Sequence, residues 1–321
     1  MADRETKAVR LVADVGGTNT RIALYDPAVD EYRALSVYRN CDHTGLEEII
    51  DPWLQALEEP APATCCIATA APPPSGEIIR MINIDWSFSC KELARRFGFE
   101  QAAWLNDFQA NAYALPHFRE DDRVLLHSGK SSTHATLAVM GPGTGLGGAT
   151  LEWVDGLPHA RDSEPGHMGL SPATEEEMKI FALLLPRYGE IHAERLVSGS
   201  GLLLLYQALA DIHGLSPVAG TPAEVSDSAL RGEDDVSVRA LETFCGLLGS
   251  ACGDFVLANG AYGGLYLAGG IVPRILAFLR ASQFLHRFQE KGAMRSHLEA
   301  VPLYAITADQ PGLIGAAHAP L

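Results

Sequence analysis

The sequence lacks the features of several common protein classes. Its six cysteines form no CxxC pair and no tight Cys/His spacing of a zinc site. They are therefore expected to be reduced thiols in a cytoplasmic protein. No apolar run approaches the roughly 20 residues that cross a bilayer, and the charged segment 1–10 is unlike a signal peptide. Export and a membrane partner are not expected.

Positive charge is also scarce. Lys and Arg total 24 against 40 Asp and Glu, so the formal net charge is −16 and the isoelectric point is near 5.0. This composition leaves no broad electrostatic footprint for nucleic acid. Any phosphate must be held locally, by backbone N–H groups and a metal ion. With 321 residues, 47% of them hydrophobic, the chain has the profile of a soluble globular protein of two domains.

Glycines, in contrast, gather where apolar segments end. The β-compatible segment 9–15 carries Asp14 and runs into Gly16-Gly17-Thr18-Asn19, and residues 21–25 resume a strand pattern. Glycines without Cβ atoms let the main chain approach a bulky anion, and the Thr and Asn add donors, although this segment taken alone favours an ordinary hairpin turn. Asp14 needs a partner at the end of an apolar strand, and hydrated Mg²⁺ would be one.

Two further glycine segments follow. Residues 141–148 contain Gly143, Thr144 and Gly145, but segment 149–154 continues as a strand where a Rossmann motif would open a helix. That context excludes a Rossmann site, and no GxxxxGK[ST] sequence occurs. The strand-like segment 263–268 ends in Gly269-Gly270, where a flat ring could lie close to the backbone. A plain strand-to-helix turn is an equal alternative.

Asn106 and Asp107 lie between the first two glycine segments, after the apolar segment 101–105 and before a helix-like segment 109–115. A carboxylate placed there can act as a base. Asp is also favoured at helix starts, because it accepts unpaired N–H groups and lies at the positive end of the dipole. Taken alone, the pair fits a simple cap as well as a catalytic site.

Two more polar positions are candidates for a binding site. The turn Glu164-Pro165-Gly166-His167 presents a carboxylate and an imidazole three positions apart. With no Cys or second His nearby in the sequence, a hydroxyl-binding role is favoured over a metal site. Glu194 could line a pocket or be an exposed charge.

The chain alternates strands and helices, which predicts an α/β fold. We expect a small α/β domain of residues 1–117, completed by a C-terminal helix at about residues 308–321, and a large α/β domain of residues 118–307. The polar segment 119–133 is expected to cross the boundary between them. The segment rich in Pro, Gly, Ser and Asp between helices predicted at 201–212 and 236–258 is expected to be a mobile loop.

Together these segments resemble the bacterial glucokinase family, the ATP-dependent hexokinases of the actin-like ATPase superfamily. The likeness runs from Leu11 nearly to the C-terminus. Each motif alone is weak evidence for this family, but six motifs in the order found in the family are a specific indication. They are residues 14–19, residues 105–108, residues 143–147, Glu164 with His167, Glu194 within residues 193–199, and residues 268–274.

The resemblance implies a two-lobed, ribonuclease H-like fold with a cleft between the lobes, and transfer of the γ-phosphate of ATP to the 6-hydroxyl of glucose. It also implies Mg²⁺ as cofactor and a cytoplasmic homodimer. Asp107 would be the catalytic base, and Asp14 would hold Mg²⁺ through water. The sugar would contact Asn106, Asp107, Glu164, His167 and Glu194. ATP would contact Asp14, Gly16, Gly17, Thr18, Asn19, Gly143, Thr144, Gly145, Gly269 and Gly270.

Two departures from the family pattern affect this interpretation. Pro165 stands where the family commonly has Gly, which stiffens the sugar-binding turn and leaves the fine sugar selectivity open. The cysteine-rich zinc motif of the related ROK sugar kinases is missing after His167, which favours the zinc-free glucokinase branch.

Two alternatives remain open from the sequence. One is a kinase for another hexose or an amino sugar. The other is a non-catalytic sugar-sensing regulator, which would need a DNA-binding helix-turn-helix, usually N-terminal. The first predicted strand begins about eight residues into the sequence and leaves no room for one.

Overall fold

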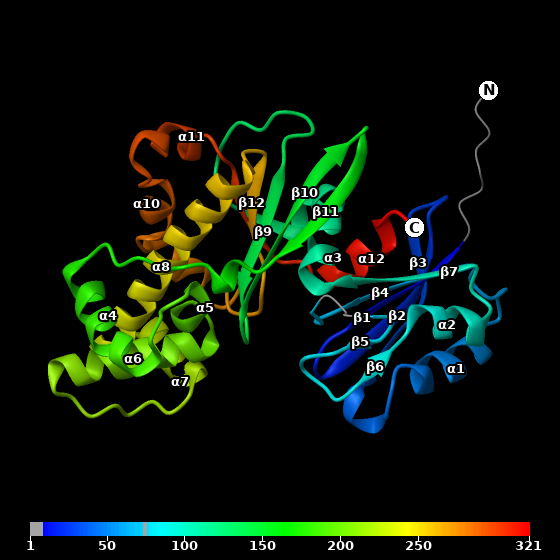
Figure 1. Ribbon diagram of the computed structural model, residues 1–321, viewed down its shortest axis with the longest axis horizontal. Helices are drawn as coiled ribbons and strands as arrows, with labels where there is room; N and C mark the ends of the chain where they lie inside the picture. The colour runs from blue at the N-terminus through cyan, green and yellow to red at the C-terminus, as the bar shows by residue number, and fades with distance from the viewer. Residues whose placement is uncertain (1–8, 73–75) are drawn as a thin grey trace. The chain divides into compact units, whose positions relative to one another are not determined.

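The chain forms two compact units in a computed structural model that describes residues 9–72 and 76–321 (Figure 1). The first unit contains the described residues up to Phe118 together with Pro158–Ala160 and Asp309–Leu321. The second contains Arg119–Leu157 and Arg161–Ala308. Both units combine helices with a mixed sheet, so the predicted α/β class is confirmed.

The first unit is built on a five-stranded sheet in the order β3, β2, β1, β4, β7. Its strands are β1 (Arg10–Val15), β2 (Asn19–Asp26), β3 (Glu31–Arg39), β4 (Thr64–Thr69) and β7 (Gln101–Asn106). Its helices are α1 (Glu47–Gln55), α2 (Cys90–Phe97), α3 (Asp107–Ala114) and α12 (Pro311–His318). A separate small sheet pairs β5 (Ile79–Arg80) with β6 (Ser87–Phe88).

Three parallel strands bring their carboxyl ends to one edge of this sheet. β1 pairs in parallel with β4, and β4 pairs in parallel with β7. Val15 therefore lies opposite Thr69, which lies opposite Asn106. The apolar residues of β1 and β4 are buried along nearly the whole of both strands, as expected where a parallel sheet is covered on both faces. The first glycine turn and the start of α3 emerge at this edge.

The second unit is built on a six-stranded sheet in the order β11, β10, β9, β12, β13, β8. Its strands are β8 (Arg123–His127), β9 (Leu137–Pro142), β10 (Leu146–Val154), β11 (Leu157–Ser163), β12 (Gly264–Leu267) and β13 (Leu303–Ile306). Strands β9, β12 and β13 are parallel, while β10 and β8 pair antiparallel with β9 and β13. The helices are α4 (Glu175–Tyr188), α5 (Ala193–Leu196), α6 (Gly199–His213), α7 (Pro222–Arg231), α8 (Asp235–Asn259), α9 (Leu276–Ala281), α10 (Phe284–Gln289) and α11 (Arg295–Glu299).

Helix α8 is the core of the second unit and packs against α6, α7 and α10 (Figure 1). Among the described helices it alone is long and apolar enough to cross a membrane. The sequence was expected to hold no apolar run of that length, and α8 differs from this expectation. However, 67% of the most apolar stretch of α8 is buried inside the protein, as is typical of a core helix.

One sequence prediction is wrong, and two strands lie where none was predicted. The segment expected to be a mobile loop contains α7, because Thr221 and Glu224 form a capping box, Pro222 occupies the first turn, and the apolar side chains of α7 are buried. The polar segment 119–133 contains strand β8, whose partner β13 is far away in sequence. Strand β3 was not predicted either, because it is an edge strand whose residues are mostly exposed.

The six cysteines are free thiols, and Cys65, Cys66, Cys245 and Cys252 are buried. Burial raises the pKa of Cys65 and Cys252 well above the ordinary range, and it raises the pKa of the half-buried Cys90 to about 11. These thiols therefore stay protonated near neutral pH, which makes them poor nucleophiles and poor metal ligands.

Helices α8 and α10 approach each other closely because α8 lacks side chains at the contact. A Cβ atom on Gly249 would lie 2.2 Å from the carbonyl oxygen of Phe284, and one on Gly253 would lie 2.5 Å from that of Phe288. Gly246, one turn earlier on α8, has more room, since its nearest neighbour would be the Arg287 guanidinium at 3.4 Å. The contact between backbones thus depends on two glycines one turn apart.

We predict that Gly249→Ala lowers the thermal unfolding midpoint, because the added methyl group forces α10 away at a cost of about 1–3 kcal/mol. Gly246→Ala on the same helix is the matched control. It should leave the midpoint unchanged or raise it slightly, because Ala is the better helix former. Differential scanning calorimetry of both variants measures the effect, and equal midpoints would contradict the prediction.

Candidate functional site

In the first unit, the predicted phosphate-binding turn joins β1 to β2. Its ends are closed by a hydrogen bond from Gly16 N to Asn19 O at 3.0 Å. Gly17 and Thr18 are exposed at its tip, where their backbone groups can reach a ligand. The hairpin predicted from the sequence is therefore confirmed, and its tip lies beside the carboxyl ends of β1, β4 and β7.

Asn40 holds this turn from behind and was not found by sequence reasoning. The residue begins a 3₁₀ turn (Asn40–Asp42) and is only 4% exposed. Its Nδ2 donates to Gly16 O at 2.7 Å, its Oδ1 accepts from Thr20 Oγ1 at 2.8 Å, and its backbone N–H donates to Thr18 O at 2.8 Å. A buried amide with all these bonds made fixes the turn before any ligand arrives.

Asp14 is half-buried at the end of β1, opposite Arg21 on β2. Burial raises the pKa of Asp14 to about 6; the positive charge of Arg21 opposes this rise, and the negative charge of Asp107 adds to it. The carboxylate faces the first turn of α12, because a Cβ atom on Gly312 would lie 2.9 Å from Asp14 Oδ1. A carboxylate that is costly to keep ionised beside a second carboxylate suits a hydrated divalent cation.

The described residues contain no group of three or more His, Cys, Asp or Glu side chains arranged to hold a metal ion. The role predicted for Asp14, which is to hold Mg²⁺ through water, stays a prediction.

Asn106 and Asp107 lie at the junction of β7 and α3. Asn106 is the N-cap, since its Oδ1 accepts from Phe108 N at 2.9 Å, and its Nδ2 donates to Ala71 O at 3.2 Å. Asp107 is the first residue of α3, and its Oδ1 also accepts from Phe108 N, at 3.0 Å. The sequence left open whether the Asn-Asp pair is a helix cap or a catalytic site, and the structure shows that Asn106 caps α3. The Asp107 carboxylate stands at the positive end of the helix, close enough to Asp14 for their charges to interact.

In the second unit, the predicted nucleotide residues meet where β9 and β12 end side by side. Ala268 N donates to Met140 O at 3.0 Å, which extends the parallel pairing beyond β12. A Cβ atom on Gly269 would lie 2.3 Å from Pro142 O, and Gly269 has a φ of 89°, so no larger residue fits there. Gly143–Gly145 and Gly269–Gly270 are thereby brought to one place, although more than a hundred residues separate them.

A cavity of about 470 Å³ is lined by Gly143 of this group, while Gly145, Gly269 and Gly270 are not part of its lining. Its walls combine Gly143 and Thr144 with the start of α6, the start of α7 and the segment before α9. Sequence reasoning missed most of this lining, which includes Ser200, Thr221, Pro222, Ile271, Arg274 and Ile275. The isoleucines offer an apolar surface to a flat ring. At the starts of α6 and α7 the N–H groups of Gly199, Gly201 and Glu224 are bonded within the protein.

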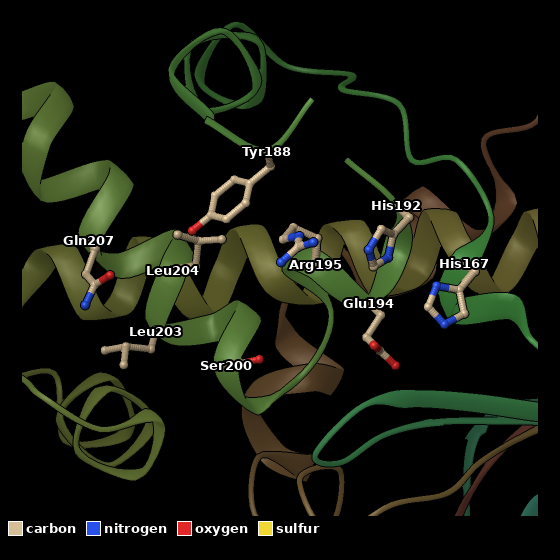
Figure 2. A pocket seen from close by; sticks show the side chains of 9 residues that line it. All are labelled: His167, Tyr188, His192, Glu194, Arg195, Ser200, Leu203, Leu204 and Gln207. Carbon is tan, nitrogen blue, oxygen red and sulfur yellow. The ribbon is translucent and has the colours of Figure 1, made fainter. Parts of the chain in front are cut away.

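A second cavity, of about 420 Å³, is lined by two of the predicted sugar contacts, His167 and Glu194 (Figure 2). His167 ends the 3₁₀ turn Pro165–His167, which directly follows Glu164. Figure 2 shows His167, His192 and Glu194 at one end of the cavity and Gln207 at the other. Glu164 is exposed and does not line this cavity.

His192 ties the sugar turn to α5 and was also missed from the sequence. Its Nδ1 lies 3.0 Å from the carbonyl oxygen of Gly166, so in the tautomer that carries hydrogen on Nδ1 the ring donates to this oxygen. Ala193 N donates to Met168 O at 2.9 Å beside this bond. His192 lies two residues before Glu194 in the sequence, but no local pattern indicated that it contacts Gly166.

A glucokinase family model matches residues 11–320 of the chain. The chain belongs to the glucokinase family. It is therefore an ATP-dependent sugar kinase. A glucokinase from Photorhabdus laumondii is 40% identical over 305 residues, which cover 95% of this chain and 94% of that protein. A glucokinase from Psychromonas ingrahamii is 39% identical, with 97% and 96% of the two chains covered.

Solved structures of the glucokinase family share the fold. The crystal structure of a glucokinase from an Antarctic psychrotroph aligns with a TM-score of 0.89 at 36% identity, and 97% of this chain and 98% of that one are covered. A ROK family glucokinase from Streptomyces griseus, solved in complex with glucose and AMPPNP, aligns with a TM-score of 0.62 at 19% identity, covering 96% and 97%. The predicted family is confirmed.

We predict that Asp14→Asn stabilises the protein at alkaline pH in the absence of ligands. The folded-state pKa near 6 exceeds the ordinary value of 3.8, so the native state binds this proton more tightly than the unfolded chain does. The stabilisation by the proton is complete below the ordinary value and is lost as pH rises through 6. At pH 8 the ionised carboxylate costs on the order of 1–3 kcal/mol, which Asn removes.

Thermal unfolding of the wild type and Asp14→Asn at pH 4, 6 and 8 measures this difference. The variant should unfold at the higher temperature at pH 8, and the gap should close towards pH 4. A gap that is independent of pH would assign the effect to packing and not to charge.

Proposed function

We propose that the protein transfers the γ-phosphate of ATP to the 6-hydroxyl of glucose, and that its two units are the lobes of an actin-like fold with a cleft between them. In this proposal the small domain comprises residues 1–117 and about 308–321, and the large domain comprises residues 118–307. The full-length match to the glucokinase model is the observation that carries the proposal. Six sequence motifs that resemble the family, in its order, support it.

Asp107 is the catalytic base in this proposal. Its carboxylate accepts the proton of the sugar 6-hydroxyl as that oxygen forms a bond to the γ-phosphorus. The bond from the γ-phosphorus to the bridging oxygen breaks in line, and ADP leaves with the electron pair. Such a reaction requires mainly positioning and charge neutralisation. The first turn of α3 holds Asp107 in place, since Asn106 caps that helix and is bonded to Ala71.

The sugar contacts divide between the two units. Glu164, His167 and Glu194 in the second unit, with Asn106 and Asp107 in the first, bind the ring hydroxyls. Carboxylates accept strong hydrogen bonds from hydroxyl groups, and a sugar that lacks one of those hydroxyls leaves a buried acceptor unpaired. Pro165 restricts the backbone between Glu164 and His167, which limits the sugar shapes that the turn accepts.

The nucleotide contacts follow the glycine segments. The turns 16–19 and 143–145 bind the phosphates through backbone N–H groups other than those of Gly16 and Gly143, which are bonded within the turns. The cavity lined by Gly143, Thr144 and Ile271 takes the adenosine. Asp14 would hold Mg²⁺ through water, and the ion would supply positive charge that offsets the negative charge of the phosphates. The resemblance further implies a cytoplasmic homodimer, and both features form part of the proposal.

A coupled assay of ADP release across a hexose panel with Mg²⁺ tests the function. We expect the highest kcat/KM with glucose, and lower values with mannose, fructose and glucosamine. A higher kcat/KM with another sugar would show that this sugar, and not glucose, is the preferred acceptor. Tight sugar binding without ADP release from any sugar would favour the sugar-sensing regulator.

We predict that Asp107→Asn lowers kcat by about 10²–10⁴-fold, which is the usual contribution of a general base. Glucose affinity should fall much less, because Asn keeps an acceptor oxygen. The matched control is Asp51→Asn, which removes an exposed carboxylate of α1 paired with Arg96 at 3.2 Å. Steady-state kinetics should show normal turnover for the control, and near-normal turnover of Asp107→Asn would remove Asp107 from this role.

A further inference from the structure

The Glu194 side chain contacts both proposed substrate-binding regions of the second unit. It lines the cavity that also contains His167 (Figure 2). Its Oε2 accepts a hydrogen bond of 2.8 Å from the backbone N–H of Leu146, which ends the second glycine turn. A residue expected to bind only sugar is thus also bonded to the turn expected to bind phosphate.

The close approach of Glu194 depends on the absence of a side chain at residue 145. A Cβ atom on Gly145 would lie 2.4 Å from Glu194 Oε2 and 3.2 Å from Glu194 Cδ. Gly143, two residues earlier in the same turn, has no atom within 4 Å of its Cβ position. The Glu194 carboxylate therefore occupies the space that a side chain at residue 145 would fill, and a side chain at residue 143 would not interfere with it.

The backbone of Glu194 is held in place independently of its side chain. A Cβ atom on Gly166 would lie 3.2 Å from Glu194 Cβ and 2.5 Å from Leu146 O, so the sugar turn, α5 and the glycine turn pack together without a gap. The Nδ1 of His192 lies 3.0 Å from Gly166 O and adds a polar contact to this packing. Since the Glu194 backbone cannot shift freely, the carboxylate position depends on the glycine turn that it touches.

We infer that Glu194 is a positioning residue that couples the binding of hexose to the shape of the phosphate turn. One carboxylate oxygen holds Leu146 N–H, and the other remains for a sugar hydroxyl, as the acceptor capacity of a carboxylate permits. Hexose binding then orders the Glu194 carboxylate and, through Leu146, the second glycine turn, while nucleotide binding to that turn orders the carboxylate. The affinities for hexose and for nucleotide are therefore linked reciprocally. The inference rests on the proposed function, because it takes Glu194 as a sugar contact.

We therefore expect that a substitution at Gly145, in the second glycine turn, weakens the binding of glucose. In Gly145→Ala the methyl group takes the place of Glu194 Oε2, and the flexible end of the Glu side chain moves aside, so the fold persists. Loss of a hydrogen bond to a charged group weakens glucose binding by about ten- to a hundredfold. This loss occurs without any nucleotide present.

Calorimetric titration of glucose into the full-length protein without nucleotide provides the test. Gly145→Ala should bind glucose about ten- to a hundredfold more weakly, while Gly246→Ala, which adds the same methyl group outside the proposed binding residues, should bind it like the wild type. Adding Gly145→Ala to Glu194→Ala should cause no further loss, because the two changes act on one contact. Thermal unfolding midpoints verify that each variant is folded.

The reciprocal measurement titrates AMPPNP with Mg²⁺ into the protein without glucose. Glu194→Asp keeps the charge but shortens the side chain, so it should weaken AMPPNP binding by releasing Leu146. Normal glucose binding by Gly145→Ala, or additive losses in the double variant, would overturn the coupling and leave the proposed function standing. A wild type that binds no glucose would overturn the proposed function and the coupling with it.

Discussion

The arrangement of both candidate regions depends on the parallel pairing of strands. Parallel neighbours end at the same edge of a sheet, so whatever follows each strand is collected there. In the first unit this pairing places Asp14, the first glycine turn and Asp107 at the ends of β1 and β7. In the second unit it joins the segments after β9 and β12. Residues far apart in sequence therefore lie together at one edge because two strands run in the same direction.

Negative charge sets a second constraint on this protein. A chain with a net charge of −16 repels polyphosphates at long range, so attraction has to come from groups at contact distance. Backbone N–H groups at glycine turns can supply such attraction without positive side chains. Burial is the largest cause of the raised pKa of Asp14, and the negative charge of Asp107 adds to it. The carboxylates at this edge of the first unit therefore form an environment that favours a cation.

Much of the fold was readable from local signals. The alternation of apolar strands and helices predicted the α/β class, and the predicted segments 9–15 and 236–258 agree with β1 and α8 to within one residue at each end. Local patterns failed where the stabilising partner is distant. Strand β8 lies within a polar segment and is a strand because it pairs with β13, whose sequence lies at the other end of the unit. Helix α7 was hidden by a composition that suggests a loop, although its capping box was present in the sequence.

The sequence alone determined the chemistry that is present: Asp14, Asp107, Glu164, His167, Glu194 and three glycine segments, because residue type and order are local properties. Only the tertiary structure decided which of them touch. The bonds of Asn40 to the first turn and of Glu194 to Leu146 join residues far apart in the chain, and no periodicity or motif spacing encodes such contacts. These contacts form only when strands pair and helices pack, because they depend on the direction and separation of whole strands and helices.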